Sequence, residues 1–213
     1  MNRFARLCLA GTALTMAAAG GAQAQEIRIS SWAPPSHPIN SMMFPNWGNC
    51  VKKESGGKLT YKMEYNLAPP PAQFNVVRKG IADVSWIFHG YNAGRYLATK
   101  VVEFPGAGPN STAVSVAYWR TQKKYLEKMN EHRGVHLLSL MSHGPAVLMT
   151  RRPITNMSQL KGVKLRLPGG VATEVFTAFG AIPVKVPSPK VYEVLSTGVA
   201  DGVSMPLETQ KSF

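Results

Sequence analysis

The segment 162–170, with the sequence GVKLRLPGG, places a single arginine where it could bind an anion. Hydrophobic alternation predicts a strand over 164–167, and the proline and glycines that follow predict a turn into a helix that begins near Val171. Arg166 would then lie at the end of the strand, beside the positive end of a helix dipole. Its guanidinium is a planar fork of N–H donors that matches a carboxylate. The spacing leaves open a second interpretation, in which Arg166 pairs with an acidic side chain of the fold.

Motifs for catalysis or metal binding are absent from the sequence. It contains no nucleophile elbow, Walker loop, dinucleotide fingerprint or HExxH zinc motif. His132 and His136 are four residues apart, but a glycine and a predicted helix end lie between them, which argues against a shared metal ion. None of the 11 acidic residues falls in a recognisable acid/base pair. We therefore expect no catalytic residues, no metal ligands and no cofactor.

The N-terminus has the three parts of a secretion signal. Arg3 and Arg6 form a basic start, and the apolar run 7–20 is too short to cross a bilayer as a mature helix. The sequence AQA at 22–24 is the small-x-small pattern that precedes a cleavage site. We predict a signal peptide over 1–24 and export to the periplasm. The alternative is an N-terminal membrane anchor.

The chain is strongly basic, with 24 lysines and arginines against 11 acidic residues and a formal net charge of +13. A nucleic-acid-binding protein would cluster this charge among aromatic residues. Here the basic pairs are scattered along the chain, at 52–53, 78–79, 123–124 and 151–152. We expect solvated surfaces that favour anionic solutes, and no nucleic-acid partner.

Strand-like and helix-like segments alternate along the chain, with glycine or proline near their ends. Such alternation is typical of an α/β protein with a parallel or mixed sheet covered by helices. The helix at 111–130 should be capped by Ser111 or Thr112. Extended segments are expected at 27–31, 59–65, 83–88, 100–104, 135–141, 146–150, 164–167, 182–186 and 202–205, and helices at 40–54, 73–79, 111–130, 171–179, 189–196 and from 207 on.

Several segments resemble the solute-binding proteins of tripartite ATP-independent periplasmic (TRAP) transporters, the DctP-like family. The block around Arg166 is the most diagnostic, and the other matching segments are 78–84, 89–96, 179–184 and 191–202. The resemblance implies an α/β fold of the two-lobed, type II-like periplasmic binding proteins, with mixed sheets flanked by helices. It also implies capture of a solute for the TRAP transporter membrane subunits. An enzyme and a sensor module remain as alternatives, the first acting on a similar anion in the periplasm.

In such a protein the ligand lies between two lobes that close about a hinge. Lobe I is expected over 25–141 and lobe II over 142–213, with the crossover near 140–142. Because family members are longer than this chain, the resemblance implies that the second lobe is C-terminally truncated and incomplete.

The resemblance also implies that Arg166 binds the ligand carboxylate through two parallel hydrogen bonds. Sialic-acid-binding members carry a second arginine where this chain has Ala146, and an asparagine where it has Met205. Both differences make the pocket less polar. We therefore expect a small organic acid with one carboxylate, of aliphatic, keto or aromatic type, in preference to a sialic acid or a dicarboxylate.

Five further residues are predicted to line the ligand site. Trp32 follows the first strand, on the side where an open sheet presents its ligands. His89 and Tyr91 lie in the loop after the third strand, and Met205 and Glu208 lie at and just after the end of the last strand. Glu208 could accept a hydrogen bond from a ligand hydroxyl, or it could complement the dipole of a helix that starts there.

Overall fold

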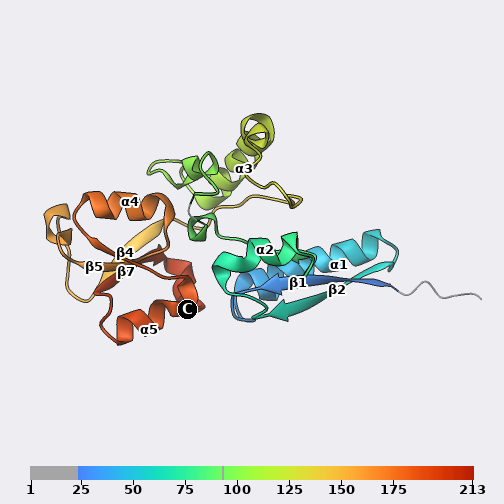
Figure 1. Ribbon diagram of the computed structural model, residues 1–213, viewed down its shortest axis with the longest axis horizontal. Helices are drawn as coiled ribbons and strands as arrows, with labels where there is room; N and C mark the ends of the chain where they lie inside the picture. The colour runs from blue at the N-terminus through green and yellow to red at the C-terminus, as the bar shows by residue number, and fades with distance from the viewer. Residues whose placement is uncertain (1–23, 93) are drawn as a thin grey trace, which may run out of the picture.

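The computed structural model describes residues 24–92 and 94–213. The predicted signal peptide, apart from Ala24, therefore lies outside the described residues. The described chain contains two separate sheets, and Figure 1 shows them at opposite ends of the long axis, with helix α3 (Ser111–Thr121) above the middle. No helix within the described ranges is long and apolar enough to cross a membrane. The α/β fold with sheets flanked by helices is confirmed.

The first sheet consists of three parallel strands in the order β2-β1-β3. The carboxyl end of β1 is buried, and its Ser30 hydroxyl donates to Gln73 Oε1 of α2 at 2.7 Å. A π-helical turn, Ile39–Met43, precedes α1 and accommodates Pro45 in the first turn of that helix. The elements of this unit are β1 (Gln25–Ser31), α1 (Phe44–Glu54), β2 (Leu59–Tyr65), α2 (Gln73–Arg78) and β3 (Val84–Ser85).

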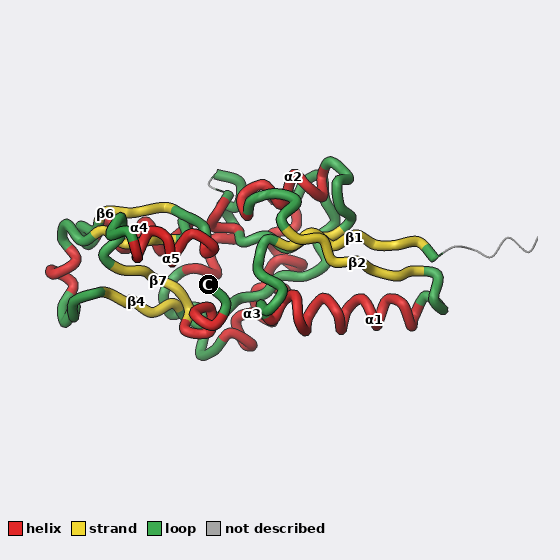
Figure 2. The backbone as a smooth tube through the Cα atoms, turned by 90° about the horizontal axis from the view of Figure 1, so that it is seen from below, coloured by secondary structure: helices red, strands yellow, loops and turns green. Residues whose placement is uncertain are grey.

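The second sheet has four strands in the order β4-β7-β5-β6, with β4 antiparallel to β7 and the other neighbours parallel. Its elements are β4 (Ala146–Thr150), β5 (Lys164–Leu167), α4 (Gly170–Ala178), β6 (Ile182–Lys185), α5 (Val191–Ser196) and β7 (Gly202–Pro206). Figure 1 shows α4 and α5 on opposite sides of this sheet, and Figure 2 shows the sheets end to end from below.

Side chains along β5 alternate between the two faces of the sheet, which places its leucines on one face and its arginine on the other. Leu165 and Leu167 are fully buried and pack in one core cluster with Phe176 of α4. Successive side chains of a strand point to opposite faces, so Arg166 lies on the face that does not carry these leucines. Its register partner on β7 is Val203, which packs in a second core cluster against Leu195 of α5. The β5 pattern thus assigns Arg166 to the α5 side of the sheet.

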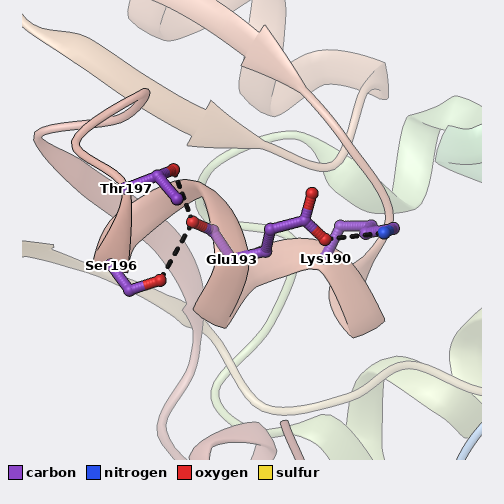
Figure 3. Close-up of polar contacts among 4 residues, drawn as sticks. All are labelled: Lys190, Glu193, Ser196 and Thr197. Atoms are coloured by element: carbon purple, nitrogen blue, oxygen red, sulfur yellow. Dashed lines mark hydrogen bonds and ion pairs between the residues drawn. The ribbon is translucent and has the colours of Figure 1, made fainter.

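Side-chain hydrogen bonds to a backbone carbonyl oxygen mark the end of helix α5. Ser196 Oγ and Thr197 Oγ1 both donate to the Glu193 carbonyl oxygen, at 3.1 and 2.7 Å, and Lys190 Nζ lies 2.6 Å from Glu193 Oε2 (Figure 3). Gly198 then adopts a φ of 73°, which glycine reaches without strain. These contacts end the helix at Ser196, as predicted, and lead the chain into β7.

Three segments that were expected to be extended differ in the structure. The strand expected at 83–88 is reduced to Val84–Ser85, the segment 100–104 lies mostly in a 3-10 helix, Thr99–Glu103, and 135–141 has no strand partner within the described ranges. Glu131 explains the helix at Thr99–Glu103. Its carboxylate accepts hydrogen bonds from the N–H groups of Leu97, Ala98 and Thr99, at 2.6, 2.6 and 3.0 Å, and so caps a helical turn.

Helix α3 has the expected extent but a different cap. It continues through a π-helical turn, Gln122–Leu126, and a 3-10 turn to Asn130, which adopts a φ of 55°. The prediction of a cap at Ser111 or Thr112 is wrong. Asn110 is extended, and its Oδ1 accepts a hydrogen bond from Ala113 N at 2.9 Å. Asparagine is among the best N-cap residues because its short side chain reaches back to the first turn.

We predict that Asn110→Ala lowers the free energy of unfolding by about 1 kcal/mol, because the Ala113 N–H loses its partner. Thr112→Ala is the matched control, since Thr112 is exposed, and it should change that free energy by less than about 0.5 kcal/mol. Urea unfolding followed by circular dichroism measures both. An equal loss in the two variants would contradict the assignment of the cap.

Candidate functional site

Arg166 is held at the carboxyl half of β5, and only 1% of its surface is exposed. Its Nε donates to the Val186 carbonyl oxygen at 2.9 Å. Because β5 and β6 are parallel neighbours, the chain that leaves β6 passes the same edge of the sheet at which Arg166 lies. This hydrogen bond fixes the guanidinium and leaves its two terminal nitrogens for other partners.

Two hydroxyl groups face the guanidinium. Arg166 Nη2 lies 3.4 Å from both Tyr91 Oη and Ser188 Oγ, and these oxygens are 3.0 Å apart. Ser188 N also donates to Tyr91 Oη, at 2.8 Å. Tyr91 comes from a 3-10 turn that follows the first sheet, whereas Arg166 and Ser188 belong to the second sheet unit. The site therefore lies where the two units meet, and contacts of 3.4 Å satisfy Nη2 only weakly.

The positive charge of Arg166 has no counter-ion among the residues that the structure describes. Each ion pair found there uses a different cation, namely Arg28, Lys62, Lys100, Lys123 or Lys190. Burial lowers the pKa of Arg166 and the neighbouring Tyr91 raises it, but a guanidinium keeps its proton in proteins. A buried charge without a partner is costly, and a bound anion would remove that cost. The described residues give no support to the interpretation that Arg166 pairs with an acid of the fold.

Tyr91, which contacts the guanidinium, belongs to an aromatic wall formed with Trp32, Trp86 and Phe213. The rings of Trp32 and Trp86 stack with centroids 4.0 Å apart, and Trp32 Nε1 donates to the Trp86 carbonyl oxygen at 3.2 Å. Tyr91 meets Trp32 edge-on at 5.7 Å, and Phe213 stacks on Trp32 at 5.9 Å with an interplanar angle of 15°. Trp32 is 8% exposed. The wall is thus a packed group of four aromatic rings, which reaches the positive charge of Arg166 through Tyr91.

Met205 and Glu208 lie in other surroundings. Met205 is 4% exposed and packs with Val191 and Val203 between β7 and α5. It borders a cavity of about 590 Å³ whose lining includes Phe213 but does not include Arg166. Glu208 is exposed, and its Oε1 accepts a hydrogen bond from Gly144 N at 2.7 Å. The structure therefore brings Tyr91 to Arg166 and packs Trp32 against Tyr91, and it places Met205 and Glu208 in different contacts.

His89 also belongs elsewhere, in a histidine cluster formed by His89, Tyr96, Tyr118 and His132. The ring of His89 stacks on Tyr96 at 3.8 Å, its Nδ1 lies 3.1 Å from Tyr118 Oη, and its Nε2 lies 3.3 Å from His132 Nε2. No group of three or more histidine, cysteine, aspartate or glutamate residues that could hold a metal ion occurs in the described part of the chain. We assign His89 to this cluster in place of the aromatic wall.

The histidine cluster is poor in charge. Burial, followed by the charge of His132, lowers the pKa of His89 to about 4, and Glu131 opposes this effect. Burial also lowers the pKa of His132 and raises that of Tyr96 to about 12. Burial would raise the pKa of the Glu131 carboxyl, but its hydrogen bonds from Ala98, Thr99 and Leu97 lower it overall. The two imidazoles are therefore neutral at pH 7, and one of them donates to the other.

Val186 and Ser188 were missed by the sequence analysis. Both follow β6, the parallel neighbour of β5, and the carboxyl ends of parallel strands share one edge of a sheet. That rule, applied to the predicted strand at 182–186, would have placed the chain around Ser188 beside Arg166. The side-chain hydroxyl itself gave no signal.

Comparison with known proteins identifies a family. Residues 29–213 match the model of the bacterial extracellular solute-binding proteins, family 7. A relative from Comamonas testosteroni, named outer membrane transporter protein TsaT, is 29% identical over 203 residues, which cover 94% of this chain and 60% of that protein. This chain thus spans about 60% of the length of that relative.

Two crystal structures of TRAP periplasmic solute-binding proteins share the fold. The protein from Bordetella bronchiseptica, with bound (R)- and (S)-mandelate, is 39% identical with a TM-score of 0.83, over 86% of this chain and 59% of that one. The protein from Rhodoferax ferrireducens, with copurified benzoate, is 32% identical with a TM-score of 0.79, over 86% of this chain and 57% of that one.

We predict that His89 makes stability depend on pH between about 4 and 6.5. The unfolded histidine binds a proton below about pH 6.5, whereas the folded one does so only near pH 4, so the unfolded state holds more protons in this range. The free energy of unfolding should therefore fall as the pH is lowered through it. Urea unfolding at several pH values should show a shallower slope for His89→Phe than for the parent. His136→Asn, which removes an exposed histidine, should keep the parent slope, and a shallower slope there would refute the assignment.

Proposed function

Because this chain belongs to family 7 of the bacterial extracellular solute-binding proteins, we propose that it captures a small organic carboxylate in the periplasm and delivers it to the membrane subunits of a TRAP transporter. The observation that carries the proposal is the buried guanidinium of Arg166, which has no counter-ion among the described residues. A ligand carboxylate would supply that charge. The chain acts as a receptor and not as an enzyme.

The ligand that fits best is an aromatic monocarboxylate. Arg166 offers one fixed cation, the hydroxyls of Tyr91 and Ser188 lie beside it, and the aromatic wall provides apolar faces. The relatives of 39% and 32% identity hold mandelate and benzoate, which are both acids of this class. An aryl ring packed against the aromatic wall and a carboxylate on Arg166 would use both halves of the site.

The energetics of such a site agree with a receptor. Charge-assisted hydrogen bonds contribute about 1.5–3 kcal/mol each, and stacking of an aryl ring adds about 0.5–1.5 kcal/mol beyond its burial. Together with burial of the ring, these contributions can reach the ~8 kcal/mol of a micromolar complex. We place the ligand between two lobes, 25–141 and 142–213, since Tyr91 comes from the first and Arg166 from the second.

Removal of the guanidinium tests the proposal. We expect Arg166→Ala to weaken benzoate binding by roughly a hundredfold, because the carboxylate loses both N–H donors. A thermal-shift titration with benzoate measures this, since a ligand of the folded state raises the melting temperature by mass action. Arg152→Ala, which removes an exposed arginine, is the control for net charge. The proposal fails if no benzoate shift is seen in the parent protein, or if Arg166→Ala keeps the parent shift.

The aromatic wall predicts a preference for aryl groups. Mandelate carries a phenyl group where lactate carries a methyl group. We expect Trp32→Leu to weaken mandelate binding by roughly tenfold, because the ring loses its stacking surface, and to change lactate binding by less than about twofold. Isothermal titration of both acids gives the two ratios. Equal losses for mandelate and lactate would show that Trp32 only supports the fold.

A further inference from the structure

The N-terminal end of helix α4, which follows β5 directly in the chain, is already covered by a carboxylate of the protein. Glu103 Oε2 accepts a hydrogen bond from Val171 N at 2.8 Å, in the first turn of the helix. Only four residues, 167–170, separate Arg166 from Val171. Free N–H groups at a helix N-terminus attract anions, and they could bind a second carboxylate of a ligand that is held by Arg166. In this chain Glu103 occupies that place.

Two glycines allow this approach. Gly170 has a φ of 60°, and a Cβ atom there would overlap Glu103 Oε2. Gly169 has a φ of 101°, and a Cβ atom there would overlap the carbonyl oxygen of Gly90. The sequence analysis interpreted the pair as a turn. In the structure they also let the segment 90–103 contact the start of α4.

Glu103 forms no ion pair of its own among the described residues, although Lys100 and His143 are close enough to lower its pKa. Lys100, on the same 3-10 helix, lies 2.5 Å from Glu174 Oε1 of α4. Glu103 has no cationic partner within 4.0 Å among the described residues. It is half-buried, and burial raises the pKa of its carboxyl while the Val171 N–H lowers it. The carboxylate is thus held mainly by the helix end.

We infer that Glu103 is a specificity-determining residue, which restricts the site to ligands with a single carboxylate. The inference rests on the proposed function, in which Arg166 binds one carboxylate. A second carboxylate on the same ligand would meet the negative charge of Glu103 where it would otherwise meet free N–H groups. Like charges repel strongly where water is partly excluded, and an unfavourable charge placed against a competing ligand is an efficient source of specificity.

The test compares benzoate with phthalate, isophthalate and terephthalate, which carry a second carboxylate at three different positions of the ring. Isothermal titration at one pH and one ionic strength gives the ratio of dissociation constants, dicarboxylate over benzoate. Glu103→Gln keeps an oxygen that can accept from Val171 N but removes the charge. We expect this ratio to fall by about tenfold or more for at least one dicarboxylate, with benzoate binding changed by less than about threefold. The inference is overturned if all three ratios stay within twofold of the parent.

Glu174→Gln is the matched control. It removes a negative charge from α4 and breaks the contact with Lys100, but Glu103 still covers the N-terminal end of α4. Loss of a contact that only holds the two segments together would weaken all four ligands alike and leave the ratios unchanged. The control should therefore keep the parent ratios. If Glu174→Gln changes the ratios as much as Glu103→Gln does, the change is a general effect of charge and the inference is overturned.

A second measurement needs no variant and covers the case in which Glu103→Gln does not fold. The parent protein should bind 4-carbamoylbenzoate, in which an uncharged amide replaces one carboxylate, at least tenfold more tightly than terephthalate. Equal affinities would overturn the inference. If the parent binds benzoate but this preference is missing, only the role of Glu103 fails. If it binds neither benzoate nor 4-carbamoylbenzoate, the proposed function fails as well.

Discussion

The buried positive charge of Arg166 sets the demands that the surrounding structure meets. A guanidinium removed from water has to be oriented and hydrogen-bonded, and it has to be left accessible to an anion. The parallel pair β5 and β6 provides the orientation through the Val186 carbonyl. Tyr91 and Ser188 provide polar contacts without a negative charge. The fold therefore stabilises this cation only in part, and a bound anion would supply the rest of the stabilisation.

The segment 90–103 joins the two sheets through polar contacts to the second sheet unit. Tyr91 contacts Ser188, Glu103 accepts from Val171 N, and Lys100 pairs with Glu174. The contacts are electrostatic or hydrogen-bonded, and those of Lys100 and Glu174 are partly exposed to solvent. Contacts of this type contribute less than apolar packing and are lost and regained at small cost. They would suit the proposed function, in which this interface closes on a ligand and then releases it.

Elements with strong local patterns were predictable from the sequence. The strand at 164–167 alternates and ends in a proline and two glycines, so its bounds and the arginine on it follow from local residues alone. The 3-10 helix at Thr99–Glu103 did not follow, because the carboxylate that caps it comes from Glu131, about thirty positions along the chain. The contacts of His89 did not follow for the same reason. Its neighbours, Tyr118 and His132, become visible only once the chain has folded.

The glycine pair at 169 and 170 also limits how this receptor can diverge. Both glycines have a positive φ, which strains any other residue, and a Cβ atom at Gly169 would also collide with the Gly90 carbonyl oxygen, so selection should hold both glycines fixed whatever the ligand. Change in ligand preference must therefore come from positions that face the site without forming its backbone. Descendants of this chain would then share one rigid anion grip and differ in the surfaces around it, which separates the inherited part of recognition from the part that is free to drift.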